Sequence, residues 1–212
     1  MVQKSDSPKK SRGRPRAYDP AQALGDATDA FWRSGYAGTS LDDLSAATGM
    51  NRPSLYGAFG DKHALYLSAL ARYIDAGRQA MDAALDAGLP LPQALMRVYD
   101  SALGLYFPAG GVARGCFLIN TAATEAMTDE EVRRSLGNGL RTFDRAFEAR
   151  FKRARAQAEI AGDADPASLA KIASALLHSL ALRSRAGDSR AALRATALAG
   201  VALLCGTSTG GV

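Results

Sequence analysis

The chain has few of the side chains on which most catalytic and metal-binding sites depend. Its 212 residues include two cysteines, Cys116 and Cys205, and two histidines, His63 and His178. The cysteines lie far apart in the sequence and indicate neither a disulfide framework nor a metal-ligand cluster. No phosphate-binding loop or nucleophile motif occurs. These absences argue against an enzyme, and they predict no cofactor and no bound metal.

Long apolar runs are also missing. The most apolar late stretch, residues 195–205, is too short to span a bilayer, and the chain does not start with a charged segment followed by an apolar one. We therefore expect a cytoplasmic protein without a membrane partner. Past Lys62 there is no alternating strand pattern and no hairpin signal. The fold class predicted is all-α, with helices over residues 61–85, 92–107, 114–127, 165–185 and 188–205 and a charged helix capped by Thr128.

Positive charge is concentrated in the first 18 residues. They contain six basic side chains and one acidic one, which leaves 20 of each in the remainder, so this tail accounts for the whole net charge of +5. With almost nothing apolar, residues 1–17 are expected to form a disordered basic arm. Arg12, Arg14 and Arg16 form a narrow cationic strip suited to the minor groove of A·T-rich DNA. A nonspecific contact with any polyanion is the alternative.

A pair of short helices meeting at a tight turn is predicted between Thr39 and Lys62. Ser40 and Asp43 form a capping-box pattern, and Gly49 suits the end of the first helix. Asn51 can cap the second helix, which has a proline in its first turn. A preceding helix over residues 20–35 would complete a small domain. This spacing is typical of a helix-turn-helix, in which the second helix presents its N-terminal end to base edges.

Each residue of this unit also has a plainer interpretation. Helix-turn-helix shapes occur as packing units without any nucleic acid. Tyr56 could donate its hydroxyl to a phosphate, or it could be a core aromatic with a solvated tip. Lys62 could meet a phosphate, or it could be a surface lysine.

The stretch from Arg12 to Leu67 resembles the DNA-binding region of the TetR/AcrR family of transcriptional regulators. The resemblance depends on the basic arm, on Phe31 and Gly35 at the end of the first helix, and on the run NRPSLYGAFGDKHAL. It implies that Thr39, Tyr56 and Lys62 contact phosphates. It further implies a set of DNA-binding residues that comprises Arg12, Arg14, Arg16, Thr39, Ser40, Asn51, Arg52, Pro53, Ser54, Tyr56 and Lys62.

Two positions depart from the family pattern. The residue after Lys62 is usually acidic but is His63 here, so a favourable partner for the helix dipole is lost. An aromatic residue usually precedes Phe59, whereas this chain has Ala58, which puts one backbone contact in doubt. Neither departure changes the class that the resemblance indicates.

The resemblance also implies the division of the chain. Residues 18–62 would be the helix-turn-helix DNA-binding domain, residues 63–206 a helical domain for effector binding and dimerisation, and residues 207–212 a flexible tail. The last two helices carry many alanines and leucines, with apolar residues on too many faces for a lone surface hairpin. We expect them to pack against a second copy in a homodimer. The two-fold axis then predicts a near-palindromic operator.

The resemblance further implies an unidentified small-molecule effector in the second domain. Helix position suggests a pocket lined by Phe107, Cys116, Phe117, Asn120, Thr121, Glu125, Phe143, Phe147 and His178. For each of these residues ordinary core packing is the alternative. Asn120 and Glu125 stand out because a polar group on an apolar helix needs a partner.

Cys116 suggests a redox variant of this function. It follows Arg114 and Gly115 at a predicted helix start, where the dipole and a nearby cation would lower the pKa of the thiol. A reactive thiol would suit a sensor of oxidants or electrophiles, although buried free cysteine is common. The functional hypothesis is thus a sequence-specific DNA-binding repressor released by an effector. The alternatives are an electrophile-sensing repressor and an architectural DNA-binding protein without an effector.

Overall fold

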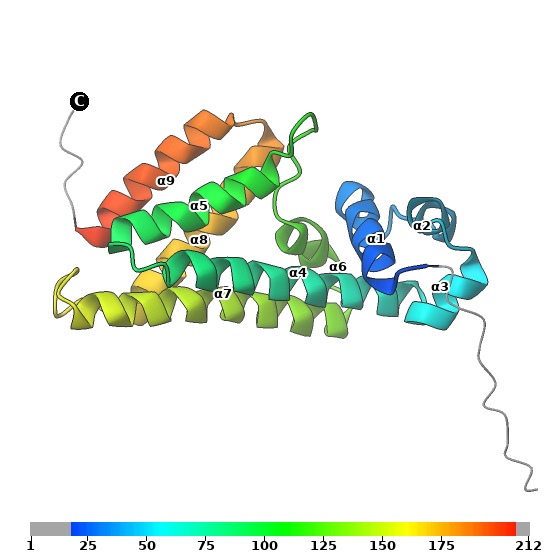
Figure 1. Cartoon of the computed structure of the whole chain (residues 1–212), viewed down its shortest axis with the longest axis horizontal. Coiled ribbons are helices and arrows are strands. Elements are labelled where there is room, and N and C mark those ends of the chain that lie inside the picture. Colours follow the sequence, from blue (N-terminus) through cyan, green and yellow to red (C-terminus); the bar gives the residue numbers. More distant parts are fainter. Residues whose placement is uncertain (1–17, 207–212) are drawn as a thin grey trace, which may run out of the picture.

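The computed structural model describes residues 18–206, and this range is helical throughout with short connections (Figure 1). The predicted basic arm and flexible tail lie outside it. No helix in this range is both long and apolar enough to cross a membrane. The elements are α1 (Pro20–Ser34), α2 (Leu41–Thr48), α3 (Arg52–Phe59), α4 (Lys62–Leu85), α5 (Leu91–Tyr106), η1 (Leu118–Ala122), α6 (Ala123–Glu125), α7 (Glu130–Ala156), α8 (Pro166–Ala186) and α9 (Arg190–Cys205).

Local capping fixes the first four helices, as the sequence predicts. Asp19 and Asp61 accept backbone N–H groups at the starts of α1 and α4. Ser40 and Asp43 form the full capping box of α2, and Asn51 caps α3 through the N–H of Ser54. These side chains satisfy donors that a helix start otherwise leaves unpaired.

The helix-turn-helix unit consists of α1, α2 and α3 and packs on the first half of α4. Phe31, Leu44 and Leu55 are buried within it. Tyr66 of α4 completes the core, with its ring centroid 5.1 Å from that of Phe31 and 4.9 Å from that of Tyr36. So small a unit depends on the neighbouring helix for part of its core. Its position relative to the remainder of the molecule therefore depends on α4.

The C-terminal domain is a bundle in which α7 runs beside both α4 and α8, while α5 packs against α9 (Figure 1). Its core contains Leu95, Tyr99, Phe147, Phe151 and Leu180, all fully buried. Figure 1 shows the helix-turn-helix unit at one end of the long α4 and this bundle along the remainder of it. A shift of α4 along or across the bundle would therefore displace the whole unit.

The prediction of a helix over residues 114–127 is wrong in two respects, its starting residue and its regular α-helical form. Helical structure begins only at Phe117, and residues 118–122 form a π-helical turn. Gly115 has a φ of 62°, and a Cβ atom there would lie 2.4 Å from Nδ2 of Asn120 and 2.7 Å from the carbonyl oxygen of Ala181. The chain thus turns sharply against α8 before the helix can start. Similarly, Asp129 rather than Thr128 caps α7.

The sequence alone suggests that the basic run near the end of α7 is a solvated face, which is only partly correct. Arg150 lies three residues after Phe147 and seven after Phe143, so it shares their buried face and is 4% exposed. Its guanidinium donates to Glu159 at 2.8 and 3.1 Å and to the Leu89 carbonyl oxygen at 3.0 Å. Arg150 therefore ties the end of α7 to the start of α5, a structural role that charge counting alone does not reveal.

Candidate nucleic-acid interface and ligand cavity

The N-terminal end of α3 is an exposed polar surface. Asn51, Arg52 and Pro53 are exposed, Ser54 is half-buried, and Tyr56 is 46% exposed. Leu55, between Ser54 and Tyr56 in the sequence, is 3% exposed and anchors α3 to the unit. The structure thus brings these predicted DNA contacts together on one face, with the positive end of the helix dipole at their centre.

Arg52 is folded back onto α2. Its Nη2 and Nε atoms donate to Oδ1 of Asp42 at 2.7 and 3.1 Å. The side chains are 54% and 77% exposed, so water screens this ion pair strongly. The pair holds the guanidinium beside the exposed face, and the sequence pattern did not reveal it.

The side-chain protons of Thr39 and Ser40 are used inside the unit. Thr39 is 1% exposed and donates its hydroxyl to the Gly35 carbonyl oxygen at 2.6 Å. Ser40 is exposed, and its hydroxyl donates to Asp43 at 2.7 Å within the capping box. This bond, together with one donated by the Ser40 backbone N–H, lowers the pKa of the Asp43 carboxyl. Of the two, Ser40 lies at the surface, whereas Thr39 is enclosed.

Lys62 and His63 lie together in the first turn of α4. The Lys62 ammonium sits 4.4 Å above the centroid of the Tyr36 ring, which is a cation–π geometry. The His63 Nε2 atom is 2.7 Å from Oδ2 of Asp129, the residue that caps α7. His63 therefore joins the helix-turn-helix end of α4 to the C-terminal domain. A contact between residues 66 positions apart leaves no local signal in the sequence.

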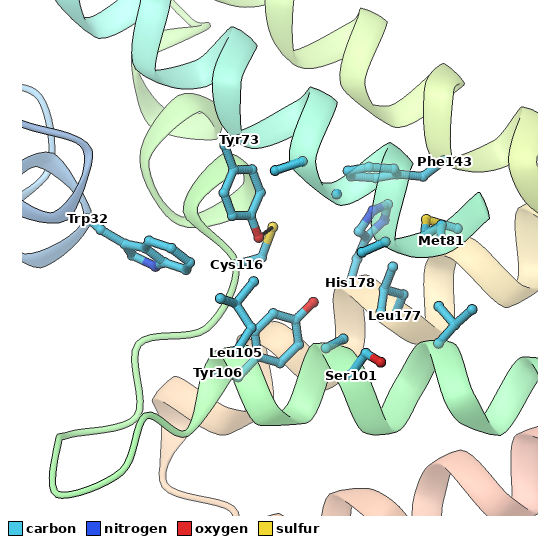
Figure 2. Close-up of a pocket in the computed structure, with 15 residues that line it drawn as sticks. Trp32, Tyr73, Met81, Ser101, Leu105, Tyr106, Cys116, Phe143, Leu177 and His178 are labelled. Carbon is cyan, nitrogen blue, oxygen red and sulfur yellow. Dashed lines mark hydrogen bonds between the residues drawn. The ribbon is translucent and has the colours of Figure 1, made fainter. Parts of the chain in front are cut away.

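A cavity of about 340 Å³ lies where α1, α4, α5, α7 and α8 meet (Figure 2). Three of the nine predicted pocket residues line it, namely Cys116, Phe143 and His178. The full lining consists of Trp32, Tyr73, Ala76, Gly77, Ala80, Met81, Val98, Ser101, Ala102, Leu105, Tyr106, Cys116, Phe143, Leu177 and His178. Its size falls in the range of pockets for small molecules.

The other six predicted pocket residues lie elsewhere. Phe117 is buried in an aromatic cluster with Tyr66 and Tyr73. Thr121 accepts a hydrogen bond from the Tyr66 hydroxyl at 2.8 Å. Asn120 donates to the Arg114 carbonyl oxygen at 2.8 Å, so its polar group has an internal partner. Phe147 packs on a neighbouring aromatic ring in the bundle core, Phe107 follows the last turn of α5, and Glu125 is half-buried in α6.

Burial raises the pKa of the Cys116 thiol, contrary to the expected lowering. Cys116 is 3% exposed, and the Tyr73 hydroxyl donates to its sulfur at 3.2 Å. The cation expected beside it points away, because the Arg114 guanidinium pairs with Asp29 at 3.0 Å. Desolvation thus dominates, and the resting form is a protonated thiol.

Trp32 belongs to the helix-turn-helix unit and forms part of the cavity wall. It belongs to α1, yet its ring lines the cavity beside Tyr73, at a centroid distance of 5.2 Å. Its Nε1 atom donates to the Arg114 carbonyl oxygen at 3.1 Å, and the Arg114 guanidinium lies 3.9 Å from the ring centroid. The sequence alone suggests that Trp32 belongs to the small domain's own core. Instead it connects two domains, and its position in the sequence gave no sign of this.

His178 is the polar group in the cavity wall that stands out. Within the described part of the chain its Nε2 atom is buried without a hydrogen-bond partner. Desolvation by burial lowers its pKa, although the charge of Asp144 opposes the shift, so the ring is neutral near pH 7. A buried unpaired nitrogen is unfavourable, and a bound molecule could satisfy it.

Comparisons with known proteins agree with this architecture. Residues 24–69 match the family model described as bacterial regulatory proteins of the tetR family, and residues 92–199 match the tetracyclin repressor-like C-terminal domain. The HTH-type transcriptional repressor ComR of Escherichia coli is 31% identical over 181 residues, which are 85% of this chain and 86% of ComR. YezE of Bacillus subtilis, an uncharacterised HTH-type transcriptional regulator, is 32% identical over 75% of this chain and 82% of its own length.

Among solved structures, a cysteine mutant of the TetR family transcriptional regulator CifR is similar over 89% of this chain and 98% of its own. Its TM-score is 0.81 and its sequence identity is 30%. That structure contains a 26-bp double-strand operator DNA. The similarity spans the helix-turn-helix unit and the C-terminal domain together.

Proposed function

Because the chain belongs to the TetR family of transcriptional regulators and is a DNA-binding regulator, we propose that it is a repressor controlled by a small molecule. In this proposal it leaves its operator when an effector fills the cavity described above. The observation that carries the proposal is the position of Trp32. One residue of the helix-turn-helix unit forms part of the cavity wall, so an occupant would touch the DNA-binding part directly.

The proposed DNA contacts follow from exposure on and around α3. Asn51, Arg52, Pro53 and Ser54 would face base edges in the major groove. Tyr56 and Lys62 would contact phosphates, with Ser40 beside them at the surface. Thr39 is enclosed and its hydroxyl proton is donated to Gly35, so its backbone N–H rather than its side chain would be offered to a phosphate. Arg12, Arg14 and Arg16 precede the described residues, and we propose them for the adjacent minor groove from the sequence alone.

A homodimer through α8 and α9 is the proposed assembly. Four large apolar side chains on these helices are exposed within residues 18–206: Ile172 by 57%, Leu182 by 55%, Leu198 by 45% and Leu203 by 84%. Exposure of several large apolar side chains on two neighbouring helices supports a protein interface. A two-fold axis through it would place two copies of α3 on successive major grooves, which requires a near-palindromic operator.

The effector proposal depends on how the domains are connected. Arg114 lies directly before the segment that carries Cys116, and it contacts both Trp32 and Asp29 of α1. A ligand that displaced the Trp32 ring would strain these contacts and shift α1 relative to α5. Such a ligand would change the populations of DNA-competent and incompetent dimers through its different affinity for them.

Selection of bound duplexes from a random DNA pool at near-physiological salt tests the proposal. A two-fold symmetric consensus is the expected result, and it would supply the probe for an effector screen. An A·T-rich pool without symmetry would instead favour an architectural DNA-binding protein. Absence of any enriched sequence would contradict the proposed reading of base edges by α3.

A further inference from the structure

We propose that the cavity binds an uncharged, mainly apolar molecule with a ring and one hydrogen-bonding oxygen, and that this oxygen pairs with His178 and Tyr106. This inference rests on the proposed function in that it assigns a ligand class to the proposed effector cavity. It can nevertheless be tested without DNA, because binding to the cavity is measurable by itself.

The lining excludes a charged ligand. Among the described residues that form the wall there is no aspartate, glutamate, lysine or arginine. An ionic group would lose its water on entry and would find no opposite charge, which is strongly unfavourable. The neutral His178 ring does not offset this, since its lowered pKa reflects the same desolvation.

The polar groups of the wall are few, and two of them already have internal partners. The Tyr73 hydroxyl donates to the Cys116 sulfur, and the Trp32 Nε1 atom donates to the Arg114 carbonyl oxygen. Ser101 is exposed, so water can satisfy its hydroxyl, and His178 and Tyr106 remain for a ligand. Figure 2 shows the Tyr106 hydroxyl pointing toward the side of the cavity on which His178 lies. One carbonyl or hydroxyl oxygen between them would satisfy the buried Nε2 atom or the phenol.

The shape of the wall favours a ring. Trp32, Tyr73, Tyr106 and Phe143 contribute aromatic faces or edges (Figure 2). Phe143 is set directly against α4, because a Cβ atom at Gly77 would lie 3.1 Å from its Cε1 and Cζ atoms. Aromatic side chains bind other rings more favourably than their contact area alone predicts.

Three probes of similar carbon skeleton separate charge from size. They are 4-phenylbutan-2-one, 3-phenylpropanoate and 3-phenylpropylammonium, titrated calorimetrically into the full chain at about pH 7, where the last two are ionised. We expect the ketone to bind at least about tenfold more tightly than either ion. Trp32 is the only tryptophan in the chain, so a change in its fluorescence reports that the ketone occupies this cavity.

His178→Phe tests the polar end of the proposal. The variant keeps a ring but removes both nitrogens, and we expect ketone affinity to fall about three- to tenfold, as for one neutral hydrogen bond. The apolar probe butylbenzene should bind equally to both proteins. Tyr106→Phe should behave in the same way. Ser174→Ala is the matched control, because Ser174 is also a buried unpaired polar residue of α8 but lies outside the lining.

Several results would overturn the inference. They are equal or tighter binding of an ion, no binding of the ketone at millimolar concentration, and an equal loss of butylbenzene and ketone affinity in His178→Phe. Failure of the proposed function gives a different pattern. In that case the ketone binds with the expected preference and dependence on His178, but no neutral aromatic ligand of the cavity releases the selected operator.

Discussion

The helix-turn-helix unit and the C-terminal domain place their binding groups in opposite ways. The unit exposes polar side chains on a short helix that is positioned by local caps such as Asn51. The C-terminal domain encloses its cavity among four of its helices and α1, and it relies on contacts between distant residues, such as Arg150 with Leu89. The comparison teaches that the surface for DNA can form locally, whereas the ligand site exists only once the bundle is packed. Trp32 belongs to the first region and lines the cavity of the second.

The largest expected effect comes from breaking a long-range contact of the C-terminal domain. Glu159→Gln should lower the free energy of unfolding by about 3 kcal/mol, because it leaves the buried Arg150 guanidinium without its carboxylate. Urea denaturation measures the loss. Glu148→Gln is the control, since its partner Lys152 is 61% exposed and the pair should contribute less than about 1 kcal/mol.

The pH dependence of stability should change with the same substitution. Hydrogen bonding to Arg150 is the main reason that the pKa of Glu159 lies below its ordinary value of 4.5. A carboxyl whose pKa is lowered by folding stabilises the protein at pH values above its unfolded-state pKa. This contribution disappears as the pH falls through the folded-state pKa. Stability should therefore decline less steeply in acid for Glu159→Gln than for the unchanged chain. An identical decline would contradict the role given to this ion pair.

The next largest effect is expected from a substitution in the helix-turn-helix unit, and this substitution should leave the fold intact. Arg52→Ala removes an exposed side chain, so stability should hardly change. We expect a loss of about 1–3 kcal/mol in preference at one base position of the selected operator, measured by repeating the selection. Lys62→Ala is the matched contrast. Loss of a phosphate contact should weaken binding to all DNA sequences alike and reduce the salt dependence of the affinity. An unchanged consensus for Arg52→Ala would show that α3 is docked differently.

Much of the helix-turn-helix unit is predictable because its signals are local. Asp19, Ser40, Asn51 and Asp61 each lie within three residues of the N–H groups that they accept, so the sequence alone locates the helix starts. Gly49, with a φ of 66°, similarly marks the turn. Capping chemistry acts over one helical turn, and a pattern of that length can be recognised without knowledge of the remaining fold.

The cavity could not be predicted in the same way. Phe143 and His178 were found from helical position, but Trp32 and Tyr106 line the cavity because of how α1 and α5 pack, and that depends on the whole bundle. The raised pKa of Cys116 has the same origin, since burial by distant residues outweighs the local dipole. Periodicity indicates which face of a helix is apolar. It does not indicate whether that face meets another side chain or a cavity.

The junction between the two regions should give an intermediate effect. Trp32→Phe keeps an aromatic ring in the wall but loses the hydrogen bond to the Arg114 carbonyl oxygen and part of the contact with the guanidinium. We expect release of the operator by a cavity ligand to need about fivefold more ligand, as for a coupling loss near 1 kcal/mol. Fluorescence anisotropy of labelled operator measures it. Leu105→Val is the control, because that residue lines the cavity from α5; equal shifts in both variants would remove the special role of Trp32.

The smallest expected effect concerns Asp42, which holds Arg52 beside the exposed face of α3. Asp42→Asn should raise the affinity for random-sequence DNA about two- to fivefold at low salt, because it frees a guanidinium and removes a carboxylate near the phosphates. Affinity for the operator should rise less, since there the Asp42 carboxylate also helps to orient Arg52 toward one base. The ratio of specific to nonspecific affinity should therefore fall.

Asp163→Asn is the matched control for Asp42→Asn. It makes the same change of net charge at an exposed position after α7, outside the helix-turn-helix unit. If that variant gained as much affinity for random DNA, the effect would come from overall charge and not from the Arg52 pair. If instead Asp42→Asn bound the operator and random DNA with unchanged affinities, Arg52 would already leave Asp42 without penalty on binding. The ion pair would then be a property of the free protein only, and Arg52 would read its base without help from Asp42.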